Sequence, residues 1–500
     1  MRGLHTQVSE LRKSVFVEVA RIAYESENVK DDLEALPYKI SPTEVPKFGD
    51  NIYQERAVSA ERARLAMGLS LRPANRPVHI TSGLDRSTVD EVYYEPPLMQ
   101  VIPSACAACE DNVYEVSNLC RNCLSHNCIE VCPVGAMEMV DGHSKIDREK
   151  CIKCGKCKAA CPYDAIGKRV RPCALSCGVK AIGSDELGRA TIDADKCLSC
   201  GMCMVNCPFG AIADKSQFFQ MIRAMRDGQK VIAEIAPAYI GQFGPEATKD
   251  KIYAALKLLG FEEVYEVALG ADIGCVSEAR DYVENVIHGD KEFALTSCCP
   301  SWAMLAKTFF PEVKDHLSLE LTPMVATARS IKKKHPDAKV VFIGPCAAKK
   351  LEAMRRTVRS DVDFVITFEE LDAIFTAKGI VPADVESHGS LHDATGAGRG
   401  YAVAGGVMGA IRKCMEEYYP DEVLVSEHYE GLADCKTALL LAKNGKKKGV
   451  LIEGMACPGG CVAGAGTLIE VNKAKKEIDK MVAASTKAVP PQELKDIELS

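Results

Sequence analysis

Cysteines in tight, repeated clusters are the residues of this chain best suited to chemistry. The sequence holds 24 cysteines, and 16 of them lie between Cys106 and Cys207. Residues 151–162 read CIKCGKCKAACP and residues 197–208 read CLSCGMCMVNCP. Both match the C-x2-C-x2-C-x3-C-P spacing in which three thiolates hold one [4Fe–4S] cubane and the fourth ligates a neighbouring one. A zinc site gives no reason for the third cysteine or the proline, so the spacing predicts clusters that transfer electrons.

Each of these two regular cysteine runs is preceded in the sequence by a less regularly spaced group of cysteines, which suggests an internal repeat. The spacing from Cys132 to Cys151 nearly matches that from Cys177 to Cys197, as if one two-cluster ferredoxin unit were inserted into another. We interpret His126, inside one motif, as a surface side chain and not as a ligand. Exchange of the fourth ligand within each unit predicts four cubanes, held by Cys120, Cys123, Cys128 and Cys161; by Cys151, Cys154, Cys157 and Cys132; by Cys197, Cys200, Cys203 and Cys177; and by Cys106, Cys109, Cys173 and Cys207.

Five more cysteines follow short apolar runs in the second half of the chain. Three runs lead directly into cysteine motifs: 293–295 into TSCCPSW (296–302), 340–343 into GPCAAKKLE (344–352), and 450–452 into EGMACPGGC (453–461). A single cubane needs four thiolates, so one of the five is left free beside it. We expect the free thiol to be Cys298 or Cys299, because adjacent residues cannot easily both face one cubane. Cys275, Cys414 and Cys435 fit no spacing and are expected to be buried apolar residues.

The elements that must position these cysteines are strands of parallel sheets. Beyond residue 228, short apolar runs alternate with amphipathic stretches, which predicts an α/β architecture. The runs are 231–235, 264–268, 293–295, 340–343, 364–366 and 450–452. Ligands in such sheets lie in the crevice outside the carboxyl ends of the strands, so three strand ends could converge on one metal site.

The three motifs resemble the signatures of the [FeFe]-hydrogenase family, TSCCPxW, PCxxKxxE and ExMACxxGC, and the resemblance covers about residues 225–470. It implies a two-lobed α/β domain with parallel sheets around an H-cluster, in addition to N-terminal α+β ferredoxin-like domains. The H-cluster is a [4Fe–4S] cubane joined to a two-iron centre that carries CO, cyanide and a dithiolate. The implied cubane ligands are Cys299, Cys346, Cys457 and Cys461, with Cys461 bridging to the two-iron centre.

The resemblance also implies roles for polar residues. Cys298 would shuttle protons, and Lys349 would donate to an iron-bound cyanide. Glu278 and Asp281, at i and i+3 on one helical face, would form the outward proton path with Ser318 between them. Without the motifs, the acidic pair would be interpreted as a solvated helix face. The implied pocket lining is Ala236, Pro237, Pro323, Met324, Glu352 and Met455.

Several positions depart from the family pattern and indicate a divergent branch. Gly344 stands where better-studied members have methionine, Met324 stands where they commonly have glutamine, and Ala465 replaces a glycine. Residues 470–500 do not resemble the usual C-terminal segment. Retention of Cys298 argues against branches that lack the proton-relay thiol.

We therefore expect a catalytic hydrogenase that interconverts protons and H2. It would exchange electrons with ferredoxin or a similar small redox carrier and would depend on hydrogenase maturation proteins. One alternative is a non-catalytic iron–sulfur assembly or sensor relative without the two-iron unit, which tends to lack the Cys298 and Lys349 pattern. Another is a simple polyferredoxin, which leaves the residues beyond 228 without a purpose.

Charge and hydropathy limit the partners and the cellular location that can be expected for this chain. The net charge is −7 with both signs interspersed, which suggests neither a nucleic acid nor an anionic membrane as a partner. No apolar stretch approaches the ~18 residues of a membrane span, and the first residues lack a signal-peptide core, so a cytoplasmic protein is expected. The expected domains are a helical region (1–100), a ferredoxin-like region (101–215), an H-cluster domain (216–475) and a tail (476–500). The helical region is expected to dock a partner or cover the relay, with helices over 8–24 and 55–67 and a loop over 36–51.

Overall fold

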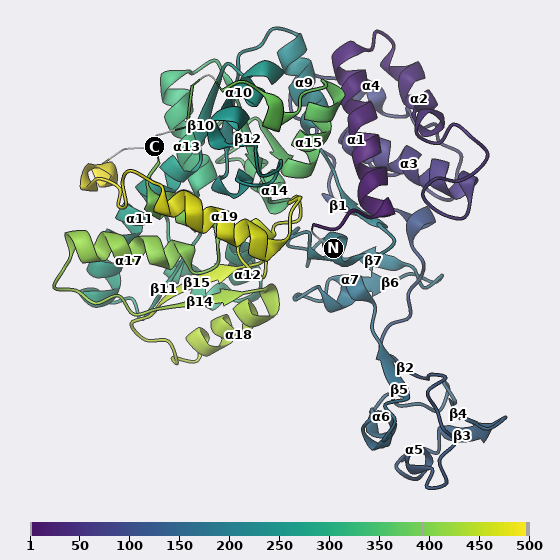
Figure 1. Cartoon of the computed structure of the whole chain (residues 1–500). Helices are drawn as coiled ribbons and strands as arrows, with labels where there is room; N and C mark the ends of the chain where they lie inside the picture. Colours follow the sequence, from purple (N-terminus) through teal and green to yellow (C-terminus); the bar gives the residue numbers. More distant parts are fainter. Residues whose placement is uncertain (1–2, 388, 392–393, 497–500) are drawn as a thin grey trace.

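Two parallel sheets and their covering helices form the body of the molecule, and a small unit projects from it (Figure 1). The computed structural model describes residues 3–387, 389–391 and 394–496. The α/β class with parallel sheets, expected from the alternating apolar runs, is confirmed. Within the described residues, no helix combines the length and apolar character of a membrane span.

The first sheet has four parallel strands in the order β10-β9-β12-β13. They are β9 (Val231–Ile235), β10 (Glu263–Glu266), β12 (Lys339–Gly344) and β13 (Phe364–Thr367). Every residue of β9 and β13 is buried, as expected for strands covered on both faces. Ile235 at the end of β9 pairs with Ile343 near the end of β12, so the carboxyl ends of these two strands lie side by side.

The second sheet has three parallel strands in the order β11-β15-β14. They are β11 (Ala294–Leu295), β14 (Ser426–Glu430) and β15 (Leu451–Met455). The central strand β15 is buried throughout, whereas no residue of the edge strand β14 is. No apolar run marks β14, because an edge strand tolerates the polar sequence SEHYE.

Helices cover both sheets and connect their strands. The longer ones after the cysteine-rich region are α9 (Phe218–Arg226), α10 (Lys249–Leu259), α11 (Ala268–Tyr282), α12 (Pro300–Phe309), α13 (Pro323–Lys334), α15 (Phe368–Ala377), α17 (Gly406–Tyr418), α18 (Leu432–Lys443) and α19 (Val471–Ala483). The short ones are α14 (Ala348–Ala353) and α16 (Gly396–Arg399). Proline at the first position of α12 and α13 presets the backbone for a helix immediately after Cys299 and Thr322.

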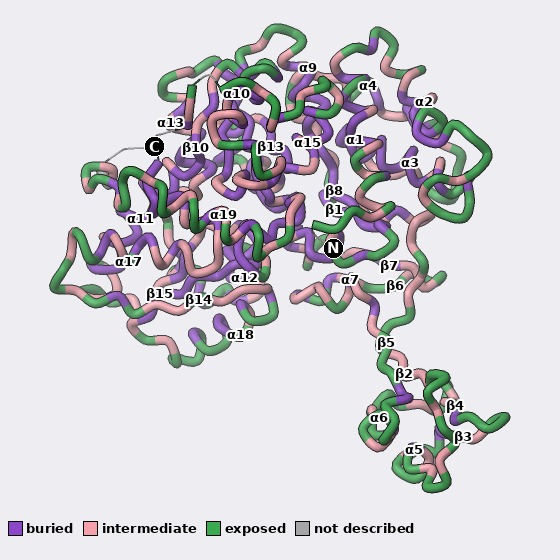
Figure 2. Tube along the Cα trace, viewed as in Figure 1, coloured by how far each residue is buried: buried purple, intermediate pink, exposed green. Residues whose placement is uncertain are grey.

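The cysteine-rich region forms two small units, one inserted into the other. The outer unit lies against the body and contains β1 (Met99–Val101), β6 (Ile182–Ser184), β7 (Ala190–Ile192), β8 (Ile212–Asp214), α7 (Pro172–Leu175) and α8 (Met202–Asn206). The inner unit contains β2 (Val113–Val116), β3 (Met137–Val140), β4 (His143–Ile146), β5 (Ile166–Arg169), α5 (Asn127–Glu130) and α6 (Lys156–Ala160). Strands β2 and β5 pair as a stalk that holds the inner unit away from the body (Figure 1), and Figure 2 shows that most of this unit is exposed or half-buried.

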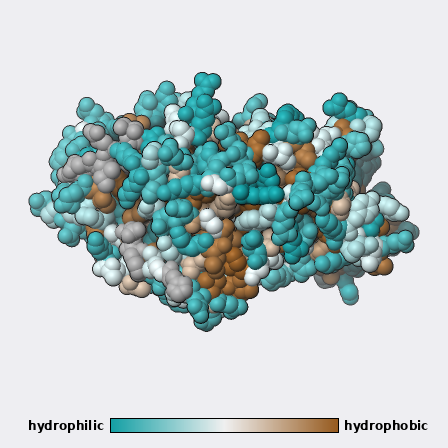
Figure 3. All heavy atoms as spheres, turned by 90° about the horizontal axis from the view of Figure 1, so that it is seen from above, coloured by the Kyte–Doolittle hydropathy of each residue, from teal (hydrophilic) through white to brown (hydrophobic). Residues whose placement is uncertain are grey.

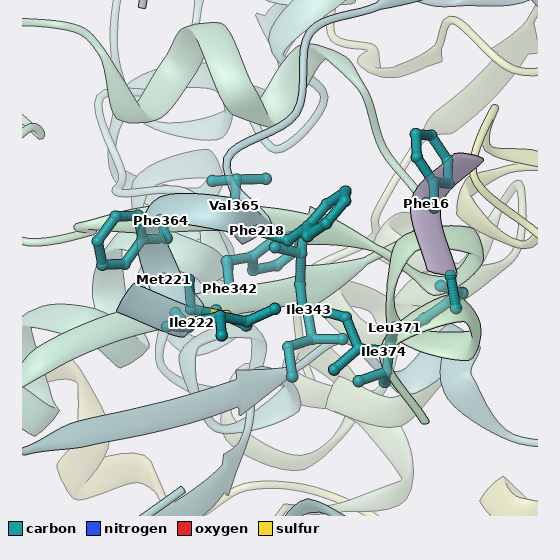
Figure 4. Close-up of a cluster of buried hydrophobic side chains, with 14 of the residues drawn as sticks. Phe16, Phe218, Met221, Ile222, Phe342, Ile343, Phe364, Val365, Leu371 and Ile374 are labelled. Atoms are coloured by element: carbon teal, nitrogen blue, oxygen red, sulfur yellow. The ribbon is translucent and has the colours of Figure 1, made fainter. Parts of the chain in front are cut away.

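The N-terminal helices share one hydrophobic core with the first sheet. They are α1 (Gln7–Glu25), α2 (Val29–Ile40), α3 (Ile52–Ala66) and α4 (Leu84–Ser87). The Phe16 ring on α1 packs edge-on against Phe218 of α9, with 5.6 Å between the ring centres. Figure 4 shows Phe16 beside Leu371 of α15, in the same cluster as the β12 and β13 side chains. The helical region is therefore an integral part of the body.

One sequence expectation for the N-terminal region needs correction. Helix α2 continues through Pro37 to Ile40, so the expected loop over 36–51 is wrong for residues 36–40. Leu33, Leu36, Pro37 and Ile40 are all buried, and this packing outweighs the hydrogen bond that proline cannot make. Helix α19 crosses the expected boundary at residue 475 and buries Ala474 and Ile478 in the main core.

The face of the molecule in Figure 3 is mostly hydrophilic, with one hydrophobic area near its lower edge.

Candidate active site and electron relay

Five cysteines from the three motifs line one cavity of about 90 Å³. Strands β11 and β15 are neighbours in the second sheet, whereas β12 is central in the first. The cavity therefore lies where the carboxyl ends of the two sheets face each other. Its cysteines are Cys298 and Cys299 after β11, Cys346 after β12, and Cys457 and Cys461 after β15.

A buried tryptophan fixes two of the cysteine loops relative to each other. Trp302 in α12 is fully buried, and its indole nitrogen donates to the carbonyl oxygen of Thr296 at 2.9 Å. A Cβ atom on Gly454 of β15 would lie 2.1 Å from the indole ring, so β15 crosses the ring at a distance that only glycine permits. The loop that carries Cys299 and the loop that carries Cys457 are thereby packed together.

The chemistry of the donor set fits an iron–sulfur group. Burial raises the pKa of Cys346 to about 11 and that of Cys461 to about 12, and neighbouring thiols add to both shifts. Thiolates crowded in such surroundings need a positive counter-charge, and iron ions supply it. The residues present therefore fit a cubane held by Cys299, Cys346, Cys457 and Cys461, with Cys298 left over.

Lys349 supplies a buried cation beside the cysteines. Its ammonium group donates to the carboxylate of Glu352 at 2.6 Å and to the carbonyl oxygen of Cys298 at 3.4 Å. Burial is the largest single effect and lowers the pKa of Lys349, but the charge and hydrogen bond of Glu352, together with the charges of Cys346 and Cys298, raise it above its ordinary value. Lys349 therefore stays charged and can bind an anionic ligand in the cavity.

The expected proton-path residues lie close together on one side of the cavity. Burial raises the pKa of Cys298, and the Glu278 carboxylate adds to the rise. Burial likewise raises the pKa of Glu278 to about 8, although the Ser318 hydroxyl donates a hydrogen bond to it. Asp281 interacts with Glu278 from one turn further along α11 and is half-exposed, and burial raises its pKa as well.

Glu320 is a further acidic residue beside Glu278 and Asp281, and it was not among the expected site residues. Burial and the charge of Asp281 raise its pKa, and the Ser277 hydroxyl donates a hydrogen bond to it. Its charge also acts on Glu278. Glu320 belongs to no motif, so only its position two residues after Ser318 could have suggested it.

The other expected pocket residues line the same cavity, namely Ala236, Pro237, Pro323, Met324 and Met455. Glu352 lies behind Lys349 and outside the lining. Two aromatic residues that the sequence analysis did not expect, Phe342 and Tyr401, complete the wall. A Cβ atom on Gly344 would lie 2.5 Å from the Phe342 ring, so Phe342 fills the space beside Gly344.

The outer unit brings its eight cysteines together in two sets. Burial raises the pKa of Cys203, and the thiols of Cys200, Cys197 and Cys177 add to the rise. In the second set, burial raises the pKa of Cys173 to about 11, and the Cys207 and Cys106 thiols contribute. Cys109 interacts with Cys106 and Cys207 in the same way. Each set thus offers the four thiols that a cubane needs.

The first of these sets lies next to the active-site cysteines. The charge of Cys299 acts on Cys200, and the Ser301 hydroxyl after Cys299 donates to the carbonyl oxygen of Leu198 at 2.9 Å. A Cβ atom on Gly201 would lie 2.4 Å from that of Ala465, so the two segments are in close contact. The outer unit therefore contacts the loops that carry the active-site cysteines.

The inner unit holds the remaining eight cysteines, and Cys154 is the only exposed one of all 24. Cys157 interacts with Cys151 and Cys154, and the Sγ atoms of Cys120 and Cys128 both contact Ser144. His126 lies 3.4 Å from the Asn122 side-chain oxygen. Among the described residues, no group of His, Cys, Asp or Glu is arranged to hold a single metal ion.

Family models match parts of the cysteine-rich region and the domain that follows it. The model described as iron only hydrogenase large subunit, C-terminal domain, matches residues 229–465. Two models described as 4Fe-4S binding domain match residues 144–167 and 189–212. These ranges contain the three active-site motifs and the two regular cysteine runs, respectively.

Curated relatives agree with the family models. Iron hydrogenase 1 of Clostridium pasteurianum is 32% identical over 67% of this chain and 67% of its own length. The periplasmic [Fe] hydrogenase large subunit of Nitratidesulfovibrio vulgaris is 29% identical over 64% of this chain and 85% of its own length.

Two further comparisons are more distant. Cytosolic iron-sulfur assembly component 3 of Bos taurus is 26% identical over 48% of this chain and 61% of its own length. A solved apo [FeFe]-hydrogenase from Chlamydomonas reinhardtii is 22% identical over 54% of this chain and 87% of that chain, with a TM-score of 0.44. Sequence identity, the matched family model and the arrangement of the three motifs together show that the chain belongs to the [FeFe]-hydrogenase family, the iron-only hydrogenases.

Proposed function

We propose that this chain is a catalytic [FeFe]-hydrogenase that interconverts protons, electrons and H2. The observation that carries the proposal is the composition of one buried cavity. Four thiols suited to a cubane, a fifth thiol that the cubane does not need, and the charged Lys349 all meet there. A protein that only transferred electrons would need neither the fifth thiol nor the lysine.

The chain's own residues would bind the H-cluster and move protons. When bound, the two-iron centre supplies the metal site at which H2 is formed or split. Cys461 would hold it to the cubane, and the Lys349 ammonium would orient it through a cyanide. Cys298 would pass protons to Glu278, whose pKa of about 8 lets it release and take up protons near neutrality. Ser318, Glu320 and Asp281 would continue the route toward solvent.

Electrons would reach the cavity through four cubanes in line. The inner unit projects on the stalk and would receive electrons first, and the outer unit would pass them to the active site (Figure 1). The partner would be ferredoxin or another small acidic electron carrier. This is supported by the exposed Cys154 and by three exposed lysines around it, Lys153, Lys156 and Lys158, which form no ion pair within the described part of the chain.

Infrared spectroscopy of the protein after treatment with hydrogenase maturation proteins tests the proposal. We expect carbonyl and cyanide stretching bands, and iron analysis should give about 22 iron atoms, from four accessory cubanes and the six-iron active cluster. A protein with filled cubanes but no such bands would contradict the proposal and indicate a non-catalytic relative instead.

A further inference from the structure

A buried serine of the inner unit contacts two cysteines of one predicted cubane. Ser144 lies in β4, the second strand of the β3–β4 hairpin. Its hydroxyl oxygen lies 3.3 Å from the Cys128 sulfur, and its backbone N–H group donates to the Cys120 sulfur at 3.5 Å. The cysteine spacing assigns both sulfurs to the same cubane, which Cys123 and Cys161 would complete. Ser144 is therefore placed against the ligand sulfurs of a single cluster.

The outer unit repeats this arrangement without the hydroxyl group. Ala190 lies in β7, the second strand of the corresponding hairpin, and is also buried. Its backbone N–H group donates to the Cys106 sulfur at 3.3 Å, just as that of Ser144 donates to Cys120. The backbone hydrogen bond is therefore common to both units, whereas the hydroxyl at this position is present in the inner unit and absent from the outer one.

The direction of the Ser144 hydroxyl bond follows from the state of the sulfur that binds iron. A cysteine that ligates iron has lost its proton, so the Cys128 sulfur would only accept a hydrogen bond. The hydroxyl oxygen also lies 3.3 Å from the sulfur of Met139, which is an uncharged thioether and a weak acceptor. A thiolate carries negative charge and accepts more strongly. With the cluster bound, the hydroxyl therefore donates to Cys128.

We propose that the Ser144 hydroxyl, by donating to the Cys128 sulfur, raises the reduction potential of the inner cubane that Cys128 holds. Reduction adds one electron, and hence one negative charge, to the cubane, and a hydrogen bond to a ligand sulfur stabilises that charge. A cubane of raised potential accepts an electron from a carrier more readily and passes it inward less readily. The proposal rests on the electron relay of the proposed function, but it does not need the two-iron centre.

Redox titration of the full chain with reconstituted iron–sulfur clusters, followed by electron paramagnetic resonance, tests the proposal. Ser144→Ala removes the hydroxyl and keeps the backbone bond to Cys120. The midpoint potential of one cubane should therefore fall, while those of the other cubanes stay unchanged. Ala190→Ser adds a hydroxyl at the repeated position of the outer unit, and it should raise the midpoint potential of a different cubane.

A second serine beside the same cubane supplies the matched control. The Ser125 hydroxyl donates to the Cys123 sulfur at 3.7 Å, but Ser125 is exposed. Water can take the place of this hydroxyl in Ser125→Ala, so the midpoint potential should stay at its native value. Water has no such access to the buried site of Ser144.

The outcomes separate this inference from the proposed function. A native chain without reducible cubanes would remove the electron relay itself. Native cubanes whose potentials are unchanged in Ser144→Ala, or change equally in Ser125→Ala, would overturn the role of Ser144 alone. Iron content is measured on every sample. If it shows that Ser144→Ala has lost the inner cubane, Ala190→Ser decides, and an unchanged potential in that variant would count against the proposal.

Discussion

At the scale of single residues, the proposed proton transfer would depend on two buried groups whose charged forms are disfavoured. Burial raises the pKa of both Cys298 and Glu278, and each negative charge would raise the pKa of the other. The two groups therefore do not both ionise readily. When one of the two groups has lost its proton, the other keeps its own and can pass it across. A proton relay needs two groups that exchange a proton in this way.

Replacement of the free thiol tests its role in proton transfer. Cys298→Ala should retain the cubane, the two-iron centre and their infrared bands, because the ligands are other cysteines. H2 turnover should fall about 10²–10⁴-fold, the usual contribution of a positioned acid or base. Cys435→Ala is the control, since this buried cysteine lies outside the cavity lining. Native turnover in Cys298→Ala would exclude the proton role.

Glu278→Gln should lower turnover about 100-fold or more, because the amide cannot carry the proton onward. It should also change the pH dependence of stability. The pKa of Glu278 is about 8 in the folded chain and about 4.3 in an unfolded one. Between these values the folded state keeps a proton that the unfolded state has lost, so the native chain loses up to about 1.4 kcal/mol of stability per pH unit.

Glutamine at position 278 has no proton to lose, which gives the stability change a definite sign. The Tm of Glu278→Gln relative to the native protein should rise from pH 5 to pH 8 and then stay constant. Glu312→Gln, at an exposed surface pair with Lys443, should show neither the change in turnover nor this trend. A Tm difference that is independent of pH would show that Glu278 does not titrate in this range.

Sequence spacing predicts which residues can bind metal better than it predicts the groups around them. The cysteine motifs could be read directly, because a cubane fixes both the number and the spacing of its ligands. Glu320 and Tyr401 could not, because their positions depend on how a loop and a 3-10 turn pack against α11. Phe342 likewise became visible as a cavity residue only through its contact with Gly344.

At the scale of elements, close packing of strand against helix determines whether the cysteine loops meet. Strand β15 precedes Cys457, and α12 follows Cys299. Their contact is made by Gly454 against the Trp302 ring, without any intervening side chain. The precision of the cubane site therefore depends on a residue that has no chemistry of its own.

Gly454→Ala should separate these two elements. The added methyl group would lie 2.1 Å from the indole ring, and neither the buried ring nor the central strand can easily move. We expect a loss of about 1–3 kcal/mol of stability and reduced iron loading. Gly409→Ala in α17 is the control, since its added methyl group meets nothing within 4 Å, and it should be neutral or slightly stabilising. Unchanged iron loading in Gly454→Ala would contradict the positioning role.

Elements with apolar runs were predictable, and those defined by long-range contacts were not. The buried strands β9, β12 and β13 match their apolar runs closely, because strands covered on both faces need mostly apolar residues. The edge strand β14 is polar and was missed. Helix α2 was not predicted, and its last residues, 36–40, were assigned to a loop, because its buried face depends on contacts with distant parts of the chain.

At the scale of the whole molecule, a buried charge network joins the N-terminal helices, the relay and the active-site body. Lys350 is fully buried and pairs with Asp214 of β8 at 2.8 Å and with Glu370 of α15 at 2.7 Å. Arg12 of α1 pairs with Glu369, the neighbour of Glu370. Because Lys350 directly follows Lys349, the network also anchors the helix that presents the cavity lysine. We propose that the N-terminal helices serve to hold the outer unit against the body.

The projecting unit, by contrast, makes its own surface available to a partner. Lys153, Lys156 and Lys158 surround the exposed Cys154 and should attract an acidic carrier over a distance. The triple variant Lys153→Glu, Lys156→Glu and Lys158→Glu should lower kcat/KM with an acidic ferredoxin about tenfold or more at low salt, with the difference shrinking as salt screens the charges. The rate with methyl viologen, a small cationic dye, should not fall.

A control must separate this local effect from the change in net charge. Lys446→Glu, Lys473→Glu and Lys476→Glu change the net charge equally, at exposed positions of the body. If the relay runs from the projecting unit inward, this second triple variant should keep the native kcat/KM with ferredoxin and the native dependence on salt. Equal losses in both triple variants would mean that the carrier responds to the overall charge, and electrons would then have to enter the chain somewhere other than beside Cys154.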